Sequence, residues 1–385
     1  MGGGLMQLVA YGAQDIYLTG NPQITFFKVV YRRHTNFSME AIEQTLNGTA
    51  SASGSQTCTI SRNGDLVNRV WLQNVQASQA YAEDNPGYLM FDNIECEIGG
   101  QQIDKQYGHW MNTWAQLTEK NDDGKAAIIA QLGDATGGGA DADDAYTHSG
   151  TRFQAMSAAG GVKAGTIGAY THYVPLQFWF CRNPGLALPL IALQYHEVKI
   201  KINYASIYHT TSVISLWCDY IYLDTDERRR FAQVSHEYLI EQVQHQNLQA
   251  SGSSDLNFNH PVKELVWTGA PDINTLTPAA LTGDFHLKLN GHDRMSARKF
   301  SYFTRCQVWD NHSGYGSIIT RDSIAVYSFA LKPEEHQPSG TCNFSRIDNA
   351  QLIASVTSDA TSHIYAVNYN VLRIMSGMGG LAYSN

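Results

Sequence analysis

The sequence is poor in charge, and its balance of charges excludes one broad class of function. Charged residues make up 16% of the 385 positions, against about 25% in a typical soluble domain. The formal net charge is −9, which argues against a surface whose main role is binding nucleic acid. The one dense basic run, Arg228 to Arg230, follows Asp226 and Glu227. That order is typical of a short helix whose charges match its dipole.

Motifs for nucleotide binding and hydrolysis are missing as well. There is no GxxxxGK[ST], no GxSxG and no GxGxxG that follows a strand. HEVKI (196–200) and HEYLI (236–240) begin like a zinc-protease motif, but each has isoleucine where the second histidine ligand is required. The sequence therefore predicts no catalytic residues, no metal site and no cofactor, and we expect the protein not to be an enzyme.

Paired cysteines and long apolar runs are also absent. The six cysteines are widely spaced without a CxxC pair, which predicts buried free thiols in a reducing compartment. The N-terminus has neither the basic region nor the cleavage site of a signal peptide. The longest apolar run, Leu186 to Leu193, contains Pro189 and is too short to span a bilayer. We expect a soluble chain that is made in the cytosol.

Four Asn-X-Ser/Thr sequons are present, although a chain without a secretory signal acquires such sequons by chance. They are retained only as candidate glycan-attachment sites, at Asn36, Asn47, Asn311 and Asn343.

The residues that are abundant indicate β-structure. Aromatics reach 11% with 21 tyrosines, which favours either a strand-rich protein or extensive contact between chains. Ile24 to Tyr31 is β-branched and aromatic on both faces, which predicts a strand buried on two sides. Val198 to Ile202 and Tyr365 to Val371 alternate as half-buried strands do. Tyr107 to Leu117 instead has apolar residues at helical spacing.

The order of elements repeats in the two halves of the chain. A hairpin turning at Gly99-Gly100 precedes one helical pattern, and a hairpin turning at Asn290-Gly291 precedes another. The aromatic strands downstream have the same spacing in both halves. This pattern predicts an internal duplication into two mostly antiparallel eight-strand units, for which jelly rolls are the natural candidate. The boundary is expected near 215–235.

A Gly/Ala/Asp-rich insertion, 121–168, interrupts the first half and is expected to be a long surface loop. Asp141, Asp143 and Asp144 could hold calcium, but they lack the EF-hand spacing and its terminal glutamate. We favour a solvated loop.

The stretch YSFALKPEEHQPSGTCNFSRIDNA (327–350) concentrates groups that an active site could use. Glu334, Glu335 and His336 could act as acids and bases, and Cys342 or Ser345 as a nucleophile. The corresponding segment of the first half, RNPGLALPLIAL (182–193), keeps the strand and proline corner without those groups. We therefore interpret the stretch as a structural turn, and a hydrolase remains the least favoured hypothesis.

Blocks throughout the chain resemble the major capsid protein of nucleocytoplasmic large DNA viruses, with the phycodnavirus-like branch nearest. They occur in the family's order over nearly the whole sequence and depart from it most in 121–168 and 268–284. The blocks are GGLMQLVAYGAQDIYLTGNPQITFFKVVYRRHTNFSMEAIEQTLNG (3–48), SRNGDLVNRVWL (61–72), FWFCRNPGLALPLIALQYHEVKI (178–200), YLDTDERRRFAQVSHEYLIEQVQ (222–244), NHPVKELVW (259–267) and the stretch ending in RID (346–348).

The resemblance implies an all-β double jelly roll with short helices in the connecting loops. It implies an N-terminal arm at 1–22, a first jelly roll at 23–224 and a second at 225–385. The two variable segments would then project outward, as candidates for host contact.

The function that the resemblance implies is that of a structural subunit of an icosahedral virus capsid, assembled in the host cytoplasm and located in the virion. Homotrimers would form pseudo-hexagonal capsomers that contact neighbouring capsomers, minor capsid and penton proteins, and the arm would contact the inner membrane layer. No direct binding of nucleic acid is expected. The alternative is a carbohydrate-binding jelly-roll module or a spike or minor capsid protein, but the insertion offers only Tyr146 and Phe153 as an aromatic platform.

Overall fold

The structure, a computed structural model, comprises two units, Met1–Asn36 and Phe37–Asn385. The residues that it describes are 3–10, 12–76, 79–81, 85–119, 151–162, 165–167, 170–206, 213–249, 252–270, 281–314, 316, 322–355 and 361–383.

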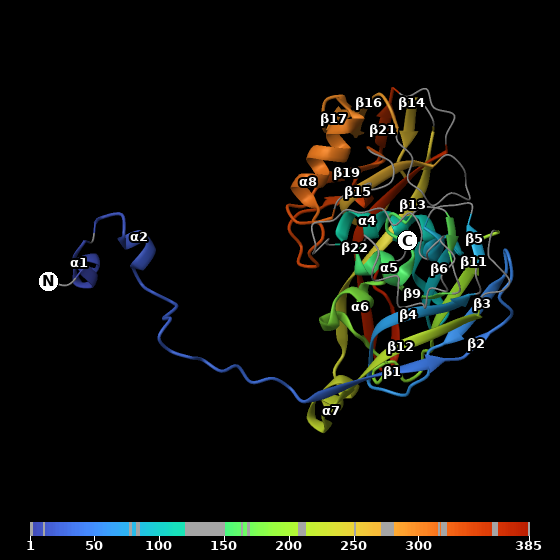
Figure 1. The fold of residues 1–385 in the computed structure, drawn as a ribbon, viewed down its shortest axis with the longest axis horizontal. Coiled ribbons are helices and arrows are strands. Elements are labelled where there is room, and N and C mark those ends of the chain that lie inside the picture. Colours follow the sequence, from blue (N-terminus) through green and yellow to red (C-terminus); the bar gives the residue numbers. More distant parts are fainter. Residues whose placement is uncertain are drawn as a thin grey trace. The chain divides into compact units, whose positions relative to one another are not determined.

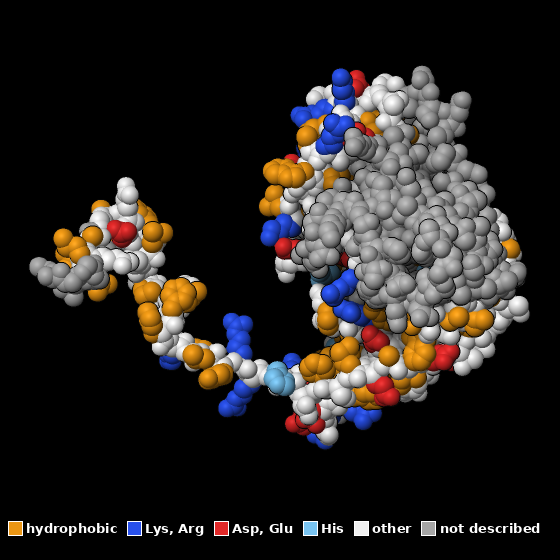
Figure 2. Space-filling view, viewed as in Figure 1, with side chains coloured by type: hydrophobic (Ala, Val, Ile, Leu, Met, Phe, Trp, Pro, Cys, Tyr) orange, Lys and Arg blue, Asp and Glu red, His pale blue; other side chains and the backbone are white. Residues whose placement is uncertain are grey.

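The N-terminal unit has two short helices, α1 (Gly3–Val9) and α2 (Ile16–Thr19), followed by extended chain. The predicted strand at Ile24 to Tyr31 is wrong: the segment pairs with no strand of the described chain, and the side chains of Phe26 and Phe27 are 90% and 100% exposed. A strand needs a neighbour for its backbone groups as well as apolar side chains. Figure 2 shows hydrophobic and basic side chains along this unit.

The first half of the larger unit contains two antiparallel five-stranded sheets (Figure 1). One has the order β1-β12-β4-β10, with β9 also paired to β4, and the other has the order β2-β3-β11-β6-β7. A separate pair joins β5 (Gln79–Tyr81) to β8 (Gly165–Ile167). The strands of the two sheets are β1 (Phe37–Gln44), β2 (Leu46–Asn47), β3 (Ser55–Thr59), β4 (Leu66–Gln76), β6 (Phe91–Ile98), β7 (Gln101–Tyr107), β9 (Tyr170–Pro175), β10 (Leu188–Pro189), β11 (Val198–Tyr204) and β12 (Val213–Leu223).

The second half repeats this arrangement. One sheet has the order β13-β22-β15-β19, with β20 on β15 and β23 on β22, and the other has the order β14-β21-β16-β17, with β18 on β16. The strands are β13 (His236–Leu248), β14 (Gly252–Asp255), β15 (Pro261–Ala270), β16 (Asp284–Leu289), β17 (His292–Asp293), β18 (Arg298–Lys299), β19 (Ile324–Ser328), β20 (Cys342–Asn343), β21 (Ala350–Ala354), β22 (Thr361–Met375) and β23 (Met378–Leu381).

The sheet orders agree with the predicted duplication. In each half the last long strand (β12, then β22) lies between the first (β1, then β13) and a central strand (β4, then β15). The number of described strands in each half exceeds the eight expected, because very short strands such as β10 and β20 are included. The all-β class and the double jelly roll are confirmed.

Helices connect the strands: α3 (Pro86–Leu89), α4 (Gly108–Thr118), α5 (Arg152–Ser157), α6 (Trp179–Arg182), α7 (Thr225–Gln233), α8 (Gln307–Asn311), the 3-10 turns η2 (Pro184–Leu186) and η4 (Phe344–Arg346), and the π-helix η3 (Tyr302–Cys306). α4 confirms the helical pattern of Tyr107 to Leu117, and its residues 108–117 are all buried. α7 separates the last strand of the first pair of sheets from the first strand of the second.

Part of the expected surface loop at 121–168 belongs to the core. Most of the segment, including Asp141, Asp143 and Asp144, lies outside the described residues, as do 271–280 of the other variable segment. Residues 151–162, however, begin with a capping box between Thr151 and Gln154 that starts α5. The small residues that follow are buried in the first core, which corrects the expectation of a surface loop for this part.

The cysteines are free thiols, as expected. Three are buried and two are half-buried, but Cys306 is exposed, which corrects the expectation of burial at that position. Among the described residues, no helix is long and apolar enough to cross a membrane.

Candidate functional site

The two halves meet through helix α4. Its Trp110, Trp114 and Leu117 pack in one apolar cluster with residues of the second half, namely Val243, Val266, Val308, Ile324, Val326, Tyr365 and Val367. Because every residue from 108 to 117 is buried, α4 is enclosed by protein on all sides, and the second half provides part of that enclosure. We call this contact, together with the charges beside it, the joint.

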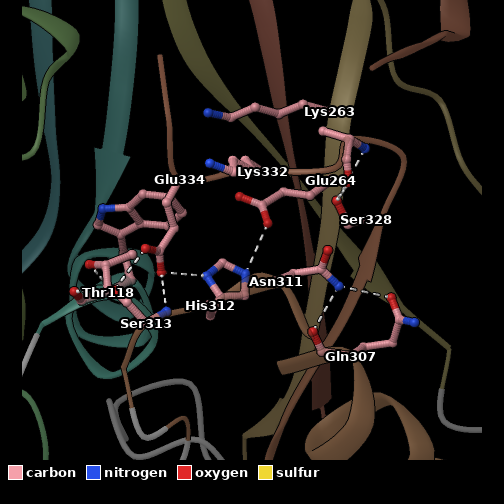
Figure 3. Close-up of polar contacts among 12 residues, drawn as sticks. Thr118, Lys263, Glu264, Gln307, Asn311, His312, Ser313, Ser328, Lys332 and Glu334 are labelled. Carbon is pink, nitrogen blue, oxygen red and sulfur yellow. Dashed lines mark hydrogen bonds and ion pairs between the residues drawn. The ribbon is translucent and has the colours of Figure 1, made fainter. Parts of the chain in front are cut away.

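His312 is the centre of the charged part of the joint (Figure 3). It follows α8, and its side chain is completely buried. Its Nδ1 lies 3.0 Å from Glu334 Oε1 and its Nε2 lies 3.1 Å from Glu264 Oε2. Burial by itself lowers the pKa of His312, but the carboxylates of Glu264 and Glu334 outweigh burial and raise that pKa to about 9. The imidazole is therefore a cation at neutral pH, and it donates from both nitrogens.

Glu334 connects His312 to the loop that follows it. Its Oε1 accepts from the backbone N–H of Ser313 at 2.8 Å, and its Oε2 accepts from Ser313 Oγ at 2.8 Å. Burial raises the pKa of Glu334, but the hydrogen bonds from His312 and Ser313 outweigh it, so the pKa is lowered. Glu334 is therefore ionised and balances the charge of His312.

The same loop closes the C-terminal end of α4. The N–H of Gly314 donates to Leu117 O at 2.8 Å, and the N–H of Gly316 donates to Gln116 O at 3.0 Å. These carbonyls belong to the last turn of a helix, which has no partners for them within the helix itself. A Cβ on Gly314 would lie 2.5 Å from the backbone of Leu117, so only glycine fits there. The second half thus caps a helix of the first.

A second group of charges surrounds Glu241 on β13. Lys263, whose side chain is completely buried, donates from Nζ to Glu241 Oε1 at 2.8 Å. Arg182 on α6 of the first half lies 3.0 Å from Glu241 Oε2, and His336 Nδ1 lies 3.3 Å from Oε1. Burial raises the pKa of Glu241, but Arg182, His336 and Lys263 together lower it to about 2. An ion pair therefore links the halves.

Ser313, His312 and Glu334 superficially suggest a catalytic triad, but their contacts do not support one. Ser313 Oγ donates to Glu334 rather than to histidine, and both nitrogens of His312 already donate to carboxylates. A cationic imidazole cannot take a proton from serine as a general base does. The arrangement can stabilise the joint, but these contacts leave it no free base.

The four residues of the hydrolase hypothesis do not converge. Glu334 and His336 belong to the two charged groups of the joint. Glu335 pairs with Lys332 at 3.0 Å on the surface. Cys342 lies on β20, and burial raises the pKa of its thiol, which disfavours the reactive thiolate.

Sequence reasoning missed His312, Lys263, Glu264 and Arg182. One signal was present: Lys263-Glu264 places two charges inside the apolar strand NHPVKELVW. A register shift between Val262 and Glu264 on β15 accommodates them.

The sequons lie in different surroundings. Asn36 and Asn47 are exposed, the latter on β2. The Nδ2 of Asn311 donates to Gln307 O at 2.8 Å within α8. The Oδ1 of Asn343 accepts from the N–H of Ser345 at 3.1 Å, so these last two amides are engaged in the fold.

Three histidines form a separate cluster at the joint. His245 Nε2 and His363 Nδ1 are 2.9 Å apart, and the rings of His109 and His363 are centred 5.0 Å apart. Burial lowers the pKa of His109 well below its ordinary value and that of His245 to about 4, and the neighbouring histidines lower both further. Burial also lowers the pKa of His363. Within the part of the chain that the structure describes, no three His, Cys, Asp or Glu side chains are arranged to hold a metal ion.

Two family profiles match the chain. The first is described as major capsid protein N-terminus and covers residues 25–224, and the second is described as large eukaryotic DNA virus major capsid protein and covers residues 227–380. The major capsid protein of Pyramimonas orientalis virus is 49% identical to this chain, and that of Paramecium bursaria Chlorella virus 1 is 41% identical, each over 100% of both chains.

Solved structures agree with these matches. The crystal structure of PBCV-1 VP54, fitted into a reconstruction of the virophage Sputnik, has a TM-score of 0.78 and 36% identity, covering 94% of this chain and 100% of that one. The Faustovirus major capsid protein has a TM-score of 0.68 with coverages of 95% and 94%; at 12% identity, this likeness concerns the fold alone.

Proposed function

Since the chain belongs to the large eukaryotic DNA virus major capsid protein family and is a structural subunit of a virus capsid, we propose that three copies form its capsomer. The observation that carries this proposal is the repeated sheet order of the two halves. Three chains with two similar β-sandwiches each present six similar units around a threefold axis, which gives a pseudo-hexagonal outline that can tile a shell. Icosahedral shells are built from such tiles.

The joint supports this role because a tile must keep its two sandwiches in one fixed arrangement. The apolar packing of α4, the Arg182–Glu241 ion pair and the loop that caps α4 each connect the halves. Buried ion pairs of this kind are better evidence of a specified geometry than of added stability.

We propose the domain boundaries that the resemblance implies: an arm at 1–22, a first jelly roll at 23–224, in which the first strand begins at Phe37, and a second at 225–385. The arm's apolar side chains are exposed, which favours contacts with other molecules. We propose neighbouring capsomers, minor capsid and penton proteins and the inner membrane layer as its partners. The protein would be synthesised and assembled in the host cytoplasm and located in the virion.

Catalysis, cofactors, metals and direct nucleic-acid binding have no part in the proposed function. The occupied nitrogens of His312 and the dispersed positions of Glu335 and Cys342 support this view. Of the glycan-attachment candidates, Asn36, Asn47 and Asn343 are exposed, as a modifying enzyme needs, whereas the Nδ2 of the half-buried Asn311 is engaged in the fold.

The deciding experiment is the mass of the purified full-length protein in solution, measured by light scattering. We expect about three times the mass of one chain, and hexagonal arrays by electron microscopy at high concentration. A variant lacking residues 1–36 serves as the comparison: because these residues form a separate unit, the remainder should still form trimers. A full-length protein that stays monomeric and forms no array would contradict the proposal, and specific binding on a glycan array would favour the carbohydrate-binding alternative.

A further inference from the structure

A groove of about 660 Å³ lies beside the joint. Its walls come from β4, α4, α5 and α6 of the first half, and Ser313 and Glu334 of the second half close one side. This volume is within the range of about 300–1,000 Å³ that is usual for ligand sites.

Two arginines of the groove have no internal role. Arg69 on β4 and Arg152 at the start of α5 are exposed, and neither makes a hydrogen bond or ion pair with another described residue. Arg182, the third, is already held by Glu241 and lies over the ring of Trp114 at 5.2 Å. Unpaired guanidinium groups in a groove of a chain with net charge −9 favour an acidic ligand, since each can bind a carboxylate through two parallel hydrogen bonds.

Two acidic residues also line the groove. Glu334 lies 3.0 Å from the cationic His312, which offsets part of its charge. Burial raises the pKa of Glu119.

Apolar side chains lie beside the arginines. Trp71, Phe153 and Met156 line the groove together with the polar side chains of Thr118, Gln177 and Ser313. An apolar peptide side chain can bury its surface against the first three, and the polar side chains can form hydrogen bonds with the peptide backbone. The combination matches an aromatic or aliphatic side chain flanked by carboxylates.

We propose that this groove binds an acidic peptide segment of a partner protein, with carboxylates on Arg69 and Arg152 and an apolar side chain against Trp71 and Phe153. The site is formed within one chain, so the inference does not depend on the proposed trimer.

The test measures binding of a fluorescein-labelled peptide, Asp-Glu-Phe-Asp-Glu, to the full-length protein by fluorescence anisotropy at low salt. The neutral peptide Asn-Gln-Phe-Asn-Gln and a heparin hexasaccharide are the comparison probes. The test variant is R69A/R152A. Its control is R229A/R230A, which makes the same change of charge at exposed positions on α7, away from the groove.

We expect the acidic peptide to bind and the neutral one not to bind. R69A/R152A should weaken binding by about tenfold or more, because charge-assisted contacts are lost, while the α7 control stays within about twofold. A single substitution, Phe153→Ala, should also weaken binding without changing its salt dependence.

Three results would each overturn the inference: no binding up to about 1 mM peptide, equal binding by R69A/R152A, or binding of the hexasaccharide and not of the peptide. Melting temperatures check that each variant is folded, which is expected of the arginine variant because both side chains are exposed and pair with no other described residue. Light scattering on the same samples shows whether the protein forms a trimer. A loss of peptide binding can then be distinguished from a loss of trimer assembly.

Discussion

The buried cation at His312 should make an unusually large contribution to the stability of the joint. The substitution His312→Gln preserves approximate size and one hydrogen bond but removes the charge between Glu264 and Glu334. The pKa of His312 rises from 6.5 to about 9, and each pKa unit corresponds to about 1.4 kcal/mol. Because the side chain is completely buried, little of this is lost to solvent screening, and we expect a destabilisation of about 3 kcal/mol at pH 7.

The pH dependence of this loss has a definite sign. The folded-state pKa of His312 lies above its unfolded value, so the stabilisation is complete below about pH 6.5 and disappears as the pH rises through about 9. At pH 10 the wild-type histidine is neutral, and the carboxylates of Glu264 and Glu334 face no cation in either protein. The stability difference between wild type and H312Q should therefore shrink towards zero.

Denaturant unfolding of both proteins at pH 6.5, 8 and 10 measures this difference. The exposed His292 on β17 supplies the control, and H292Q should change stability by no more than about 0.5 kcal/mol. A difference below about 1 kcal/mol between wild type and H312Q at pH 7, or one that persists unchanged at pH 10, would refute the charged-histidine account.

Three further predictions concern other parts of the joint. Arg182→Met should lower the free energy of unfolding by about 2 kcal/mol, which is less than the loss of a fully buried ion pair because the arginine is partly exposed. The same substitution should speed proteolysis between the halves. The pKa of His245 is lowered to about 4 and that of His363 is also lowered, so the stability of the protein should fall as the pH drops below about 6.5. Between pH 7 and pH 5, the melting temperature of the variant H245N/H363N should fall less than that of wild type. An equal fall in both proteins would contradict this prediction. Gly314→Ala should lower the free energy of unfolding, measured with denaturant, by about 1–3 kcal/mol, because the new Cβ would lie 2.5 Å from the backbone of Leu117. An unchanged denaturation midpoint would show that the loop can move away from Leu117.

Local periodicity accounts for most of what could be predicted. The alternation of Val198 to Ile202 appears in the structure as β11, with buried and half-buried residues in turn, since side chains of a strand point to opposite faces. The helical spacing of Tyr107 to Leu117 likewise became α4. These patterns depend on neighbours in the chain, so the sequence shows them directly.

The segment at Ile24 to Tyr31 shows where this reasoning fails. Its side chains have the composition of a doubly buried strand, yet they are exposed in the structure. Composition indicates that a segment favours burial, but a strand forms only where another backbone supplies hydrogen bonds.

By itself, the sequence determined the all-β class, the duplication and the positions of its main strands and of α4, because these follow from periodic patterns and from the spacing of turns. Only the tertiary structure decided how the halves are joined. Arg182 pairs with Glu241, and His312 pairs with Glu264 and Glu334, because α6 of the first half and the loop after α8 both pack against one sheet of the second half. Of these residues the sequence singled out only Glu334, as a possible acid or base, and burial beside partners of opposite charge gives all of them a structural role.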